Sequence, residues 1–213
     1  MTTISQRVED PLLAVLLRLF PHPTVKDAMN CLKIEQVQDA AVRVAERARQ
    51  FAIDEDERRR TKGGKDLINY RGFYVGAVGI GLILSPWQGP YPYTWFAFAA
   101  FNTKPSKKAR KYCAEKRLMR GARKNRCTCL GGLAVSGELQ PDGRSGIQGL
   151  NLDPCGACRD DAAGEYRSLF RNGTLLLTAQ PGSQFREVKT MSQLMEAHGE
   201  KWPQLSKHRA GRP

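Results

Sequence analysis

The strongest pattern of hydrophobic and polar positions lies between residues 35 and 59. Apolar residues recur there at spacings of four, three, four and three, which places them on one face of a helix. These residues are Val37, Ala41, Val44, Ala48 and Phe51. The polar side carries Arg43, Glu46, Arg47 and Arg49. The pattern predicts one long amphipathic helix, which Gly63 and Gly64 end.

Two shorter helices are expected before this long one. Asp10 can cap a helix with Pro11 at its first position, and Thr24 followed by Asp27 reads as a second cap. The apolar run from 11 to 20 has only ten residues and follows acidic residues, so it is too short to span a bilayer and has the wrong flank for secretion. We therefore expect residues 1–34 to form an N-terminal helical extension, with no membrane segment and no signal peptide.

Two stretches with strand character follow the long helix. Residues 70–84 and 95–101 are rich in β-branched and aromatic residues, and a turn-forming segment separates them. They predict a hairpin with a long loop. Trp87, Tyr91 and Tyr93 could stack on a nucleic-acid base. The alternative, which is the commoner case, is that such a loop packs on its own domain.

The rest of the chain alternates between helices and strands. The expected elements are helices at 114–122, from 153 and at 191–197, and strands at 130–135 and 174–179. A loop is expected at 138–150, and the helical region that begins at 153 continues or restarts over residues 161–170. Helices on both faces of a mixed sheet form a three-layer α/β/α sandwich, which is the predicted fold class. We place this catalytic domain at residues 35–200 and expect residues 201–213 to be a basic, flexible tail.

Two short motifs carry the candidate chemistry. Cys113-Ala114-Glu115 supplies one thiol and one carboxylate, and Pro154-Cys155-Gly156-Ala157-Cys158 supplies two thiols three residues apart. A catalytic zinc takes three protein ligands and keeps its fourth position for water. Cys113, Cys155 and Cys158 are therefore the candidate ligands of one Zn²⁺ per chain. Glu115 is the candidate catalytic acid and base, close to the metal without binding it.

A structural zinc site is the alternative. Such a site needs a fourth ligand, and Cys127, Cys129 and three histidines are available. Cys127 and Cys129 lead into a predicted strand, so we expect these thiols to flank the site. A structural site also gives no role to a Glu two residues after a lone Cys. The catalytic interpretation is therefore favoured.

The two motifs resemble the zinc signature of the cytidine deaminase family. Residues 73–77, Phe-Tyr-Val-Gly-Ala, also resemble a strand of that family. Asn102 lies eleven residues before Cys113, where small tetrameric members place an Asn that binds the ribose. The resemblance covers roughly residues 35–197. It implies the α/β/α fold and zinc-dependent hydrolytic deamination of cytosine in a cytidine-like nucleoside, giving the uracil product and ammonia.

The resemblance also implies roles for neighbouring residues. Phe73 and Asn102 would contact the substrate. Lys104 stands where the family has a ribose-binding Glu, so a cation replaces a carboxylate in the expected sugar subsite. Lys116 and Arg159 would balance the negative charge of three thiolates on one zinc. Small members of the family are homotetramers, so a homo-oligomer is expected.

Charge leaves a second substrate class open. The chain has 34 basic and 21 acidic residues, a formal net charge of +13, which raises affinity for polyanions. The partner is therefore a small pyrimidine nucleoside or nucleotide or, alternatively, cytosine in single-stranded nucleic acid. A non-catalytic zinc-binding module is the second alternative. Thiolate ligands must stay reduced, so we expect a cytoplasmic protein.

Overall fold

The computed structural model describes residues 11–63, 67–69, 72–85, 91–108, 111–137, 153–182 and 186–203. At its centre is a five-stranded sheet with the strand order β2-β1-β3-β4-β5. The strands are β1 (Val75–Leu84), β2 (Tyr93–Phe101), β3 (Cys127–Gly137), β4 (Phe170–Ala179) and β5 (Arg186–Thr190). β3 and β4 are parallel and the other neighbours are antiparallel, so the sheet is mixed.

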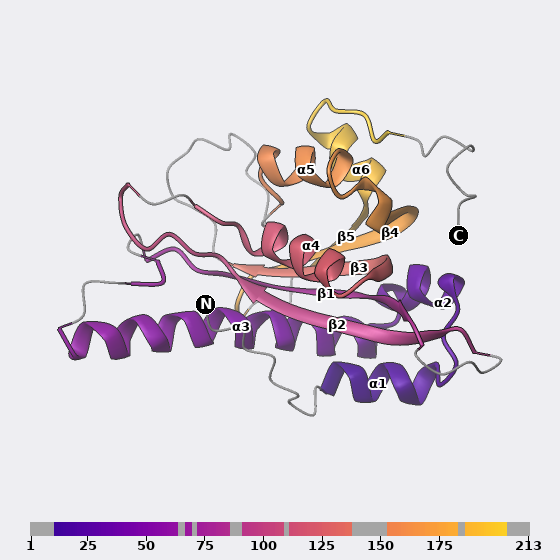
Figure 1. The fold of residues 1–213 in the computed structure, drawn as a ribbon, viewed down its shortest axis with the longest axis horizontal. Coiled ribbons are helices and arrows are strands. Elements are labelled where there is room, and N and C mark those ends of the chain that lie inside the picture. Colours follow the sequence, from indigo (N-terminus) through magenta and orange to yellow (C-terminus); the bar gives the residue numbers. More distant parts are fainter. Residues whose placement is uncertain are drawn as a thin grey trace.

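Helices cover both faces of the sheet (Figure 1). One face packs against α1 (Pro11–Leu19), α2 (Val25–Asn30) and α3 (Glu35–Thr61). The other packs against α4 (Ala114–Lys124), α5 (Gly156–Ala163) and α6 (Met191–Ala197). Short 3₁₀ helices occupy Cys31–Lys33 and Arg167–Leu169. The predicted three-layer α/β/α sandwich is confirmed.

The buried face of α3 differs in part from the predicted one. Val37, Ala41 and Val44 are buried as the spacing predicts. Phe51 is instead 42% exposed, and its ring lies 5.7 Å from that of Phe101. Small side chains, such as Ala45 and Ala52, are buried in its place.

Close approach between α3 and β1 explains why small residues were selected there. A Cβ atom on Gly76 would lie 1.9 Å from the main-chain oxygen of Ala45. No side chain fits at this crossing, so the beginning of β1 is held directly against the helix. The beginning of β1 also borders the candidate site described below.

The N-terminal helices share the core of the domain. Leu12 and Leu16 of α1 are fully buried in the hydrophobic cluster that contains α3 and the sheet. The predicted cap at Thr24 is present, because its side chain and that of Asp27 bond reciprocally to each other's main-chain N–H. The predicted cap at Asp10 lies outside the described residues. No helix of the described residues is long and apolar enough to cross a membrane.

One strand was not predicted. β5 has the sequence Arg-Glu-Val-Lys-Thr, with one apolar residue, so its hydrophobic pattern carries no strand signal. It pairs with β4 from residue 186 to residue 190 and forms an edge of the sheet. The helical region expected to reach residue 170 is shorter than predicted. α5 ends at Ala163, a 3₁₀ helix covers Arg167–Leu169, and β4 begins at Phe170.

A buried carboxylate on α3 fixes the segment that precedes β1. Asp56 is fully buried and accepts hydrogen bonds from the main-chain N–H groups of Ile68 and Asn69 and from the Tyr74 hydroxyl. The Asn69 side chain in turn donates to the carbonyl oxygen of Phe73. Asp56 therefore anchors the chain that presents Phe73.

We expect Asp56→Ala to lower the free energy of unfolding by about 3–5 kcal/mol, because it leaves three buried donors without an acceptor at roughly 1–3 kcal/mol each. Urea unfolding followed by circular dichroism measures the change. Asp54→Ala is the matched control, since Asp54 is an exposed carboxylate on the same helix and should cost less than about 0.5 kcal/mol. Equal losses in the two variants would contradict the anchoring role.

Candidate metal centre and active site

The three candidate ligands come together between the starts of two helices. Cys113 caps α4, Cys155 caps α5, and Cys158 lies in the first turn of α5. Their sulfur atoms all lie within 4.8 Å of one another, and those of Cys113 and Cys155 are 3.6 Å apart. Among the described residues, no further Cys, His, Asp or Glu joins this group. Three thiols in such a cluster are a donor set that suits zinc with one position left open.

Local helix geometry brings the second pair of thiols together. Cys155 has an extended backbone, with φ −65° and ψ 159°, and its carbonyl oxygen accepts from the N–H of Cys158 at 2.8 Å and of Arg159 at 3.0 Å. This first turn places Cys158 on the same side as Cys155. The positive end of the helix dipole favours thiolate at this position.

The three thiols shift one another's pKa values through hydrogen bonds. Hydrogen bonds from Cys113 and Cys158 lower the pKa of Cys155 to about 2. The hydrogen bonds with Cys113 and Cys155 raise the pKa of Cys158, and the bond with Cys155 raises that of Cys113 to about 12. Binding of a metal by all three thiols would release the protons that they still carry.

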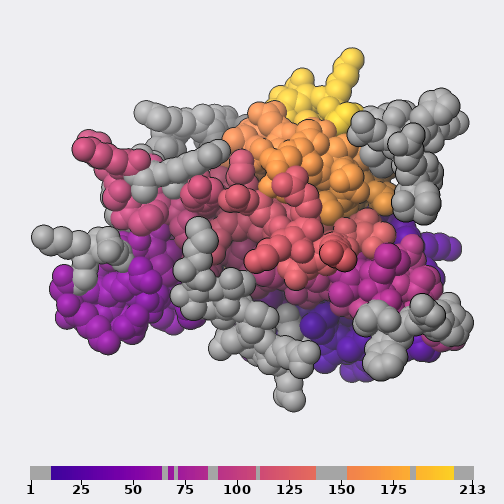
Figure 2. All heavy atoms as spheres, in the orientation of Figure 1, coloured from indigo at the N-terminus to yellow at the C-terminus, as the bar shows by residue number. Residues whose placement is uncertain are grey.

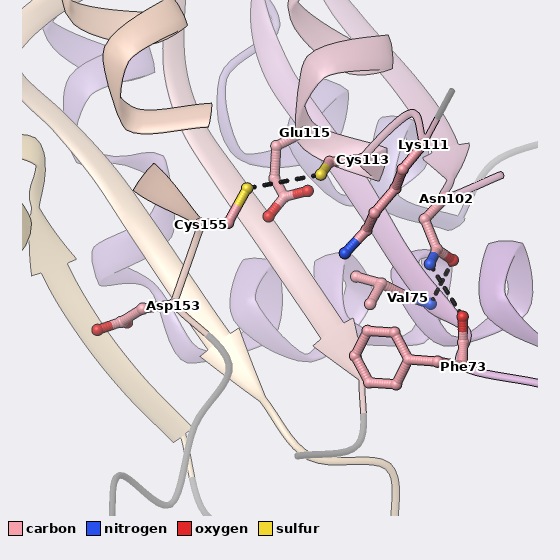
Figure 3. A pocket seen from close by; sticks show the side chains of 8 residues that line it. All are labelled: Phe73, Val75, Asn102, Lys111, Cys113, Glu115, Asp153 and Cys155. Carbon is pink, nitrogen blue, oxygen red and sulfur yellow. Dashed lines mark hydrogen bonds between the residues drawn. The ribbon is translucent and has the colours of Figure 1, made fainter. Parts of the chain in front are cut away.

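Glu115 lies in the first turn of α4, immediately beside the thiols (Figure 3). Its side chain points into the same cavity as Cys113 and Cys155 and is only 6% exposed. Burial raises the pKa of Glu115 to about 7, with the charge on Cys155 adding to the rise and Lys111 opposing it. A carboxyl group in this range can both take up and release a proton near neutrality.

The cavity between these residues has a volume of about 50 Å³. This space lies directly beside two of the candidate ligands and Glu115. The lining residues are Phe73, Val75, Asn102, Lys111, Cys113, Glu115, Asp153 and Cys155 (Figure 3).

Two of the predicted substrate-binding residues line this cavity. Phe73 does so from the segment before β1. Asn102 is 1% exposed, and its amide donates to the carbonyl oxygen of Phe73 at 2.9 Å and accepts from the N–H of Val75 at 2.8 Å. Asn102 therefore holds the cavity wall in place, and its contact with a ribose stays a prediction.

Lys104 is not among the residues that line the cavity. Its main-chain N–H donates to the carbonyl oxygen of Ile68 at 2.8 Å, and residues 69 and 104 form an isolated β-bridge. Its place in a sugar subsite stays a prediction.

The two residues expected to balance charge have carboxylate partners. Lys116 pairs with Asp161 at 2.6 Å, which ties α4 to α5. Arg159 binds Glu200 through two nitrogens at 3.0 and 2.8 Å and donates to the carbonyl oxygen of Pro154 at 2.8 Å. Arg159 thus holds the residue that precedes Cys155.

The C-terminal segment supplies this partner of Arg159. In Figure 2 it lies as a yellow ridge against the orange surface of the α5 and β4 region. Trp202 packs edge-on against Phe170, and the guanidinium carbon of Arg167 lies 4.5 Å from the centre of the Trp202 ring. The segment that contains Glu200 is therefore fastened to the domain, and the charge-balancing roles of Lys116 and Arg159 stay predictions.

Three cavity residues, Val75, Lys111 and Asp153, were missed from the sequence. The Lys111 ammonium lies 5.9 Å from the centre of the Phe73 ring, and its position two residues before Cys113 was the available signal. Asp153 lines the cavity but turns its carboxylate away from the thiols (Figure 3). That carboxylate binds Lys189 at 3.0 and 3.1 Å and lies 3.4 Å from His198.

The candidates for a fourth ligand lie elsewhere. Cys127 is buried in β3 and donates its thiol proton to the carbonyl oxygen of Cys129 at 3.2 Å. His22 stacks on Tyr91 with ring centres 3.7 Å apart. The remaining histidine, His208, lies outside the described residues, as do Trp87, the expected loop at 138–150 and the tail from residue 204.

Comparison with known proteins adds one structural likeness. No protein-family model matches the sequence, and no curated protein matches it. The crystal structure of cytidine deaminase from Burkholderia pseudomallei is similar, with a TM-score of 0.48 and 19% sequence identity over 74% of this chain and 94% of that chain. A likeness of this degree carries no argument about activity, so the site geometry has to carry it.

Proposed function

We propose that the protein is a zinc-dependent hydrolase that deaminates cytosine in a cytidine-like nucleoside. The observation that carries the proposal is the position of a buried carboxylate, Glu115, in one cavity with the clustered thiols of Cys113, Cys155 and Cys158. Three ligands beside an acid/base group are what hydrolysis of a ring amino group needs.

Each residue has a stated task. Cys113, Cys155 and Cys158 hold the zinc, which when bound supplies a water acidic enough to serve as a nucleophile near neutral pH. Glu115 accepts a proton on its carboxylate, gives one to the ring nitrogen of cytosine and assists the departure of the amino group. Cytosine and water thereby become uracil and ammonia.

The burial of Glu115 argues against a purely structural zinc. Among the described residues its carboxylate makes no ion pair, and burying an unpaired carboxylate costs stability. A structural site gains nothing from that cost. An acid/base group does, because burial brings its proton affinity into the working range.

Ammonia release from a panel of cytosine compounds tests this proposal. The panel holds cytidine, deoxycytidine, their monophosphates, single-stranded DNA and single-stranded RNA, with adenosine as the control. We expect release from cytidine with conversion of its absorbance to that of uridine, and none from adenosine. Zinc-loaded protein that releases no ammonia from any cytosine compound would instead be a non-catalytic zinc module.

The assembly and the compartment belong to this proposal as predictions. A homo-oligomer and a cytoplasmic location are what the resemblance and the reduced thiols imply. The described cysteines are all free thiols, as zinc ligation requires.

A further inference from the structure

A second hollow, the α3 groove, lies between α3 and the turn after β4. Its volume is about 330 Å³, and it is broadly open to solvent. It is lined by Arg43, Glu46, Arg47, Arg49 and Gln50 of α3 and by Pro181 and Gly182. The α3 side of the groove therefore carries three guanidinium groups and one carboxylate.

The α3 groove and the catalytic cavity adjoin the same end of the sheet, where β1 begins and β3 and β4 end. Val75, which lines the cavity, begins β1 and pairs with Gly137 at the end of β3. Ser136 of β3 pairs with Ala179, the last residue of β4, and Pro181 of the groove follows two residues later. The two hollows thus lie on opposite faces of the sheet at this end of the strands.

A direct contact joins the two hollows. Arg49, which lines the groove, donates from Nε to the carbonyl oxygen of Tyr74 at 3.3 Å. Tyr74 stands in the chain between Phe73 and Val75, and both of these line the cavity. The wall of the cavity and the groove are therefore joined through the main chain at Tyr74.

The arginines of the groove differ from others on α3. Arg58 and Arg59 are paired with Glu55, whereas Arg43 and Arg47 are exposed and make no ion pair within the described part of the chain. Arg43 and Arg47 are four residues apart, about 6 Å along the helix axis. Cations on successive turns suit a row of phosphates better than one isolated anion.

We infer that the α3 groove binds backbone phosphates of a single-stranded nucleic acid that passes this end of the sheet. That a cytosine of the same strand enters the catalytic cavity rests on the proposed function. A single strand is required, because a base can reach an enclosed site only when it is unpaired and unstacked. The net charge of +13 favours binding of a polyanion without regard to position, whereas the arginines of the groove provide a defined site for the phosphates.

Fluorescence anisotropy with a labelled single-stranded oligonucleotide of about 15 nucleotides tests the groove directly. We expect the double variant Arg43→Gln/Arg47→Gln to bind about tenfold more weakly at moderate salt. Because each contacted phosphate contributes about 0.7 to the slope of log K against log salt on single strands, the slope should fall by about 1.4. The control Arg120→Gln/Lys124→Gln removes two exposed cations from the far end of α4 and should change affinity less than about twofold.

Equal losses in both double variants would overturn the inference, because they would show that only overall charge matters. Polyglutamate or inorganic phosphate displacing the oligonucleotide as well as an unlabelled strand does would overturn it too. Both pairs of residues are exposed, so thermal unfolding should show that each variant folds as the wild type does.

Turnover separates this inference from the proposed function. We expect Arg43→Gln/Arg47→Gln to lower kcat/KM for a cytosine-containing oligonucleotide about tenfold relative to kcat/KM for free cytidine. If no cytosine compound is deaminated, the proposed function fails, whereas the anisotropy result still decides whether the groove binds the strand. An unchanged ratio would show that the groove takes no part in substrate binding.

Discussion

Glu115→Gln should lower kcat/KM for the deaminated cytosine compound by at least about a hundredfold while the bound zinc is retained. Gln has nearly the same shape as Glu, so the cavity wall stays filled, but its amide cannot take up and release the proton that deamination requires. Removing a positioned acid/base commonly costs roughly 10²–10⁴-fold. Ammonia release measures the loss, and metal analysis of the same preparation measures the zinc.

A second carboxylate provides the control. Glu165 is half exposed and pairs with Arg123 at 2.9 Å, away from the cavity, so Glu165→Gln should leave turnover unchanged. Glu115→Gln should also leave the free energy of unfolding undiminished, because it removes a buried charge with no ion-pair partner among the described residues. Wild-type turnover in Glu115→Gln would show that another group moves the proton.

The metal cluster could be predicted from the sequence because its parts are local. Cys155 and Cys158 share one helical turn, and Glu115 is two residues from Cys113, so short-range geometry sets most of their arrangement. Only the meeting of the two motifs is a long-range event. The resemblance implied this meeting, and in the structure the three sulfur atoms lie within 4.8 Å of one another.

The partners of the charged residues could not be predicted in this way. Lys116 forms an ion pair with Asp161, and Arg159 forms one with Glu200. Both pairs depend on how α5 and the C-terminal segment pack. Neither pairing leaves a periodic signal in the sequence. Lys111, by contrast, lines the cavity although it belongs to no regular element.

The fold shows the same division. The long α3 and the β1–β2 hairpin follow from strong apolar patterns, whereas β5 carries one apolar residue and forms only by pairing with β4. On α3 the periodicity favoured the large Phe51, but close packing against Gly76 selects small residues for the buried face. Tertiary packing thus decides between faces that the spacing alone leaves nearly equal.

Cys155→Ala should reduce bound zinc from one per chain to nearly none. Two thiols remain, and a site with two protein ligands holds zinc far more weakly than one with three. Metal analysis after dialysis gives the stoichiometry. Thermal unfolding with and without a chelator gives an independent measure, because a metal that binds only the folded state raises the melting temperature. The wild type should lose stability with the chelator, and the variant should not respond.

Cys127→Ala is the matched control, and it separates the catalytic from the structural interpretation of the site. Its thiol is buried and bonded to the carbonyl oxygen of Cys129, so its loss should lower stability modestly and leave the zinc in place. Zinc retained in Cys127→Ala and lost in Cys155→Ala supports a three-thiolate centre that keeps one position open for water. Zinc lost from both variants would indicate that Cys127 is a fourth ligand. The zinc would then have no open position for water, and hydrolysis could not proceed there. Zinc retained in both would remove Cys155 from the metal site altogether.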